Sequence, residues 1–156
     1  MRSASLLQVK TTQRRRNSAD NSNRSWRTQS PIDTLHAKFR EVTGKLRRTV
    51  TDIHAILLVG PGGVIDSIVD DPKINVETIA EEYATLLRIA RSASEDSGAG
   101  NVRENILVSE KSIMIARAIP PDLYLILVSG AHDQVGRARY ELKKAAWDIQ
   151  DPKDSR

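Results

Sequence analysis

The sequence predicts an α+β domain in which a five-stranded antiparallel sheet carries helices on both faces. Segments with helical and strand patterns follow in the order helix, two strands, helix, three strands, helix. Most links between strands are short, which is typical of antiparallel pairing. Two strand candidates are apolar on both faces, so both faces of the sheet should be covered. Because strands and helices do not alternate, a doubly wound nucleotide-binding fold is not expected.

The first helix is expected over residues 32–50. Ser30 can cap its N-terminus, Pro31 suits the first helical position, and Asp33 favours the positive end of the helix dipole. Apolar residues then recur at steps of three and four, which predicts one buried stripe: Ile32, Leu35, Phe39, Val42, Leu46 and Val50.

A β-hairpin is expected next. Residues 53–59 are apolar at both odd and even positions, which is typical of a central strand. The turn Gly60-Pro61-Gly62-Gly63 joins this run to a second β-rich run at 64–69.

The second helix, expected over residues 75–94, carries more apolar surface than one packing partner requires. Asn75 is a good N-cap, and Glu77 lies in the first turn. The main stripe consists of Val76, Ile79, Ala80, Tyr83, Leu86, Leu87 and Ala90. Ala84, Ile89 and Ala93 widen the apolar surface beyond that stripe. Residues 94–101 are expected to form a loop.

Three short strands and a helix complete the domain. The strands are expected at 102–108, 113–118 and 123–128. Polar residues interrupt the first of them, which places it at an edge of the sheet, whereas the last is apolar throughout and should be central. The final helix, over 132–150, has one apolar face, with His132 and Asp133 at its start.

Positive charge is concentrated in residues 1–30, which hold seven basic residues and one acidic residue. The rest of the chain holds 17 basic and 19 acidic residues. We interpret residues 1–30 as a basic disordered tail, since their few apolar residues cannot offset the entropy lost on ordering. Alternatives are an arm that docks on nucleic acid or anionic membrane, a targeting segment, or a wrongly assigned start codon. Residues 151–156 form a short C-terminal tail.

Composition restricts the chemistry. With no Cys among 156 residues, disulfide scaffolds, thiolate metal sites and Cys nucleophiles are excluded. The longest apolar run, 123–128, is far shorter than the about 20 residues that span a bilayer. We therefore expect a soluble, cytoplasmic protein.

No motif predicts an active site. A phosphate-binding loop requires a Lys-Ser/Thr pair after its glycines. No such pair follows the glycine-rich turn of this sequence. His36, His54 and His132 form no metal-ligand spacing, and the neighbouring carboxylates are expected on turns and solvent faces. We therefore expect a binding or scaffold module without catalytic residues, cofactor, metal or small-molecule substrate.

The order of elements and the apolar pattern over residues 31–150 resemble the Roadblock/dynein light-chain family. The resemblance rests on the first helix, the Gly-containing hairpin with VIDSIV, the helix ETIAEEYATLLRIA, the three closing strands and the last helix. Longin and profilin-like domains have related topologies. The resemblance implies a dimer in which the second helix packs on its mate and the edge strand pairs across the interface. It also implies a Ras-like small GTPase as partner, with GTP hydrolysis stimulated without a donated arginine finger.

The surplus apolar surface fits such a homodimer. Its candidate interface residues are Ile79, Tyr83, Leu86, Leu87, Ala90, Val102, Ile106 and Val108. The last three share one strand parity. The alternative for the helix is that it only packs on its own sheet. Alternatives for the function are an adaptor that docks through the basic arm and a small-molecule sensor with a pocket between sheet and helix.

Overall fold

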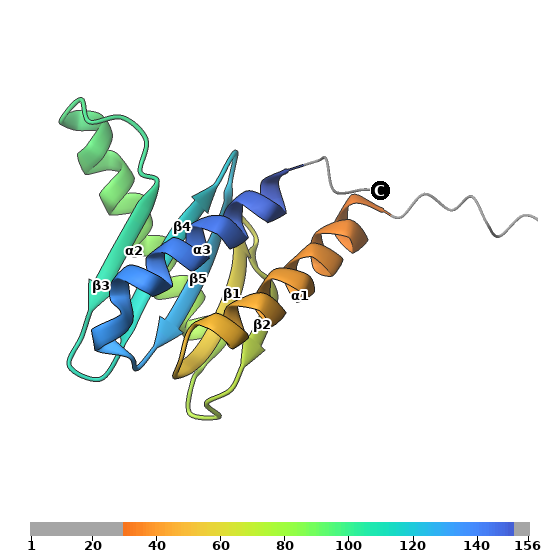
Figure 1. The fold of residues 1–156 in the computed structure, drawn as a ribbon. Helices are drawn as coiled ribbons and strands as arrows, with labels where there is room; N and C mark the ends of the chain where they lie inside the picture. Colours follow the sequence, from red (N-terminus) through yellow and green to blue (C-terminus); the bar gives the residue numbers. More distant parts are fainter. Residues whose placement is uncertain (1–29, 152–156) are drawn as a thin grey trace, which may run out of the picture.

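The computed structural model describes residues 30–151 as three layers (Figure 1). Its elements are α1 (Pro31–Thr49), β1 (Ile53–Gly60), β2 (Gly63–Val69), α2 (Val76–Asp96), β3 (Glu104–Val108), β4 (Ile113–Ile119), β5 (Leu123–Ser129), a 3₁₀ turn (His132–Gln134) and α3 (Val135–Gln150). All strands pair antiparallel in the order β2-β1-β5-β4-β3. Helices α1 and α3 lie side by side on one face of the sheet, and α2 lies on the other. The predicted fold class is confirmed.

The N-terminus of α1 forms as the sequence predicts. The Asp33 backbone N–H donates to Ser30 Oγ at 3.2 Å, and Ser30 Oγ donates back to Asp33 Oδ2 at 2.8 Å. These bonds satisfy a backbone donor that the helix itself leaves unpaired. Phe39, Val42 and Leu46 of the predicted stripe are buried against the sheet.

The central strands are β1 and β5, as their unbroken apolar sequences predict. Ile56 and Leu58 of β1 lie in the core beneath α1 and α3, whereas Ala55 and Leu57 face α2. Side chains alternate across a strand, so a strand covered on both faces must be apolar at every position. Burial of each leucine contributes about 1.5–3 kcal/mol to folding.

Several predicted boundaries are corrected by the structure. Helix α2 continues to Asp96, so its last residues replace the start of the expected loop. Strand β3 begins at Glu104, which leaves Val102 outside it. The last α-helix begins at Val135 rather than at residue 132, because His132–Gln134 form a 3₁₀ turn, and Gln134 precedes the helix without a side-chain cap.

His132 anchors the turn that precedes the last helix. Its Nδ1 lies 2.9 Å from the Gly130 carbonyl oxygen, and its Nε2 lies 2.8 Å from that of Ser109. The ring therefore connects the turn before α3 to the β3–β4 hairpin, and the two carbonyls raise the pKa of His132 above its ordinary value.

The two predicted tails lie outside the described residues, apart from Ser30 and Asp151 at their inner ends. No helix within residues 30–151 combines the length and apolarity needed to cross a membrane.

Candidate protein-interaction surface

Helix α2 uses part of its predicted interface stripe to pack on its own sheet. Tyr83 and Leu87 are buried in the core beneath α2. The Tyr83 hydroxyl lies 3.2 Å from Asn105 Oδ1 and 3.3 Å from the Met114 carbonyl oxygen, so it ties α2 to β3 and β4. Burial raises the pKa of Tyr83 to about 12. In this structure these two side chains therefore serve the protomer core.

A second side of α2 remains accessible. Ile79, Leu86 and Ala90 are half-buried, and Ile89 is 60% exposed. At 100° per residue these four lie on one flank of the helix, next to the buried stripe. We call Ile79, Leu86, Ile89 and Ala90 the α2 flank. The sequence pattern singled out Ile89 only as an extension of the stripe, yet it is the most exposed member of this flank.

The β3 residues predicted for the interface lie on the opposite face from α2. Ile106 packs against the core beneath α1 and α3, and Val108, two positions on, shares that face and is 61% exposed. The β3 residues on the α2 side are Asn105 and Leu107, and Leu107 is 39% exposed. Leu107 is not among the predicted interface residues. The alternation of side chains along a strand separates two faces but does not show which face lies toward which helix.

The outer edge of β3 is open. Within the part of the chain that the structure describes, β3 pairs with β4 alone and ends the sheet. An edge strand presents unpaired N–H and C=O groups on which another strand can pair. The α2 flank, Leu107 and the β3 edge therefore combine an apolar surface with a strand that can extend the sheet.

A groove of about 530 Å³ runs along the other flank of α2. It lies between α2 and the ends of the two central strands, where Arg88 and Arg91 come near Asp122 and Tyr124. No sequence pattern indicates this groove, since its walls come from segments far apart along the chain.

Two histidines form separate pairs with single carboxylates. His36 Nδ1 lies 2.6 Å from Asp66 Oδ2, across α1 and β2, and His54 Nε2 lies 3.3 Å from Asp52 Oδ1. Among residues 30–151, no cluster of three or more His, Asp or Glu side chains could hold a metal ion. The glycine-rich turn closes the β1–β2 hairpin as predicted, with Gly63 at φ 112°.

Comparison with known proteins gives matches at the level of three-dimensional structure. No protein-family model and no curated protein sequence matches the chain. Among solved structures, a Roadblock/LC7 domain from Streptomyces avermitilis has a TM-score of 0.61 and 18% identity, covering 70% of this chain and 92% of that one. The chain has the Roadblock/LC7 fold.

Two further structural matches come from Myxococcus xanthus. MglB has a TM-score of 0.66 and 14% identity, covering 79% of this chain and 90% of MglB. MglC has a TM-score of 0.51 and 28% identity, covering 72% of this chain and 97% of MglC. The resemblance noted in the sequence is thereby confirmed for the fold.

Proposed function

We propose that this Roadblock/LC7-fold chain is a homodimeric regulator or scaffold that binds a Ras-like small GTPase. It contributes no catalytic residue, and the nucleotide and Mg²⁺ belong to the GTPase. Stimulation of GTP hydrolysis would come from holding the water-positioning groups of the GTPase in place.

The α2 flank beside the open edge of β3 is the observation that supports a dimer. A two-fold interface uses the same patch on both copies, so one apolar flank and one free strand edge suffice to build it. Pairing of two β3 strands would satisfy backbone groups that each edge leaves open. The α2 flank of each copy would also cover Ile89 and Leu107 of the other.

The dimer is tested on the full chain by light scattering across concentrations. Leu86→Asp should give a folded monomer, because Leu86 is half-buried on the α2 flank and the exposed part of its side chain can contact a partner. Unfolding of this variant would assign Leu86 to the protomer core. A wild-type chain that stays monomeric at micromolar concentration would contradict the dimer.

The GTPase role is tested by binding and single-turnover GTP hydrolysis with the Ras-like GTPases of the source organism. Binding with faster hydrolysis would support a stimulating regulator, and binding at an unchanged rate would support a tether. No binding and no rate change with any of them would refute the proposal.

The basic arm provides an alternative function. Seven basic residues and one acidic residue in 1–30 suit a phosphate-rich polymer or an anionic membrane. Replacing Arg14, Arg15 and Arg16 with Gln distinguishes the two ideas. If partner binding disappears in this variant and falls steeply with salt in the wild type, the arm carries the function.

A further inference from the structure

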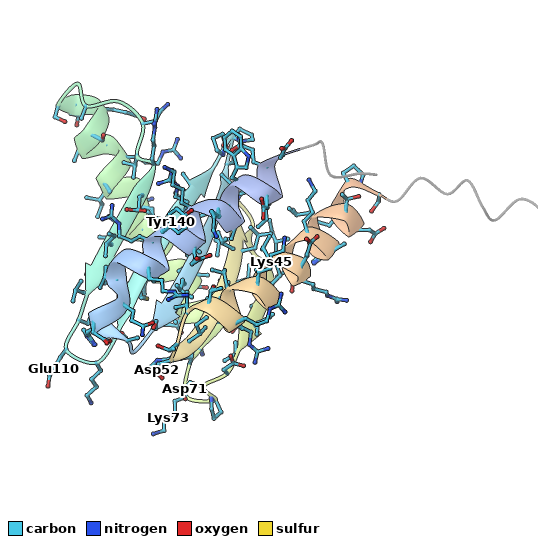
Figure 2. All side chains as sticks on the ribbon, viewed as in Figure 1. Lys45, Asp52, Asp71, Lys73, Glu110 and Tyr140 are labelled. Carbon is cyan, nitrogen blue, oxygen red and sulfur yellow. The ribbon has the colours of Figure 1, made fainter. Side chains whose placement is uncertain are left out.

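The solvent-facing side of α3 carries two large exposed aromatic rings. Tyr140 is 60% exposed and Trp147 is 67% exposed. With Lys144 they occupy positions i, i+4 and i+7, so they form one row along the helix. We call Tyr140, Lys144 and Trp147 the α3 ridge. Figure 2 shows Tyr140 on α3, and Lys45 where α1 runs beside it.

The α3 ridge borders a cationic depression of about 790 Å³ formed by α1, α3, β4 and the segment before β3. The lining includes two carboxylates, Glu141 and Asp148, and six cations: Lys45, Arg48, Arg103, Arg117, Lys143 and Lys144. The excess of positive charge complements an acidic ligand.

Part of that charge is not neutralised within the protein. Lys144 lies 3.0 Å from Glu141, and Arg117 Nη1 lies 3.5 Å from Glu104. Arg103 and Lys143, in contrast, are exposed and form no ion pair with any side chain in residues 30–151. These two cations can therefore meet incoming carboxylates without breaking an existing pair.

The geometry favours a protein ligand over a nucleic acid. Single-stranded nucleic acids stack their bases on open aromatic faces. Here Lys144 Nζ lies 4.9 Å from the centre of the Tyr140 ring, which covers one face of that ring. Trp, Tyr and Arg are also the residues that dominate binding energy in protein interfaces.

A bilayer is a poorer match than an acidic segment. Membrane-surface helices insert a continuous apolar face. On α1 and α3 the large exposed apolar side chains are Ile32, Tyr140 and Trp147, and charged residues surround the two aromatic rings. A concave cationic surface with one aromatic row suits an extended or helical chain instead.

We propose that the α3 ridge and the depression beside it bind an acidic segment of a partner protein, with carboxylates against Arg103 and Lys143 and an apolar side chain against Trp147. This surface lies on the opposite face of the sheet from α2. It does not depend on the proposed dimer or on GTPase binding, and would let one chain hold two partners at once.

The test uses the full chain carrying Trp26→Phe, which leaves Trp147 as the only tryptophan of the sequence. The probe is a short peptide of Glu and Asp around two leucines, and the reference peptide replaces the acids with Gln and Asn. Binding is followed by Trp147 fluorescence, and affinity is measured by calorimetry. The expected result is a shifted Trp147 emission with the acidic peptide and no shift with the amide peptide.

Charge reversal separates this surface from the basic arm, which also attracts acidic peptides. Lys143→Glu with Lys144→Glu should weaken binding at least about tenfold, because each reversed exposed charge replaces an attraction by a repulsion. The matched control reverses Lys73 and Lys111, two exposed lysines on other turns, and should retain affinity. Thermal unfolding by circular dichroism checks that both double variants are folded.

Three results would overturn the proposal. The first is an unchanged Trp147 emission at saturating acidic peptide. The second is equal affinity for the two double variants, which would assign binding to the arm. The third is an equal or larger emission shift with a thymidine oligonucleotide or with phosphatidylserine vesicles.

Discussion

Replacing Ile89 with aspartate should dissociate the proposed dimer without unfolding the protomer. Ile89 is 60% exposed, so a partner can bury most of its side chain while the protomer core does not need it. Full burial of an isoleucine contributes about 1.5–3 kcal/mol, so the exposed part contributes about 1–2 kcal/mol per copy. A symmetric interface contains two copies of Ile89, so the loss is doubled. The dissociation constant of the Ile89→Asp dimer should therefore exceed that of the wild type by about 30- to 1,000-fold.

The assay is sedimentation or light scattering of the full chain across a concentration series, together with urea unfolding. Ala84→Asp is the matched control, because Ala84 is exposed on the other flank of α2 and aspartate is a poorer helix former than alanine. It should leave the dissociation constant within about threefold of the wild type, a difference below 1 kcal/mol. Both variants should keep the wild-type unfolding free energy to within about 0.5–1 kcal/mol when compared as monomers.

An Ile89→Asp variant that dimerises as tightly as the wild type would refute a dimer formed through the α2 flank. Equal dissociation of the dimer by Ala84→Asp would refute it too, since the α2 flank would then have no special role. Loss of folding in Ile89→Asp would show that the side chain belongs to the protomer core.

Three further predictions concern the protomer. Tyr83→Phe should lower the free energy of unfolding by about 0.5–1.5 kcal/mol in urea titrations, because Asn105 loses its partner. Since burial raises the pKa of Tyr83 from 10.0 to about 12, the unfolded chain ionises first, and stability should fall above about pH 10 in the wild type but less in Tyr83→Phe. The Ser109 and Gly130 carbonyls raise the pKa of His132. The contribution of His132 to stability should therefore be complete below about pH 6.5 and lost as the pH rises through the pKa of the folded state. An NMR titration of the imidazole ring measures that pKa. Leu125→Ala, in the middle of β5, should cost about 2–5 kcal/mol in urea unfolding, because Leu125 is fully buried; a loss near zero would contradict the central position of that strand.

Local signals predicted the elements well where the relevant chemistry lies within a few residues. Asn75 caps α2 as expected, since its Oδ1 accepts the Thr78 N–H at 2.9 Å. The contact between His132 and the Ser109 carbonyl could not be foreseen, because the two residues are distant in sequence. The end of α2 was placed too early, since nothing in its last turn resembles a strong stop signal before Gly98.

The candidate interaction surface was predicted in part. The surplus of apolar residues on α2 is visible in the sequence, and Ile79, Leu86 and Ala90 do lie on an accessible flank. The division between that flank and the buried stripe, in which Tyr83 lies, depends on where the sheet stands relative to the helix. The sequence did not predict the α3 ridge, because a sequence alone does not distinguish an exposed tyrosine or tryptophan from one that is buried in a core.

The sequence by itself determined the order of helices and strands, the caps of α1 and α2, and the central places of β1 and β5. Periodicity and capping act over one or two helical turns, so they can be read along the chain. Only the tertiary structure decided which parity of β3 faces α2, and that Arg103 joins Lys143 beside Trp147. The alternation of side chains along a strand defines two faces but does not show which element covers each face. That is decided only when segments distant in sequence pack together and bury apolar surface.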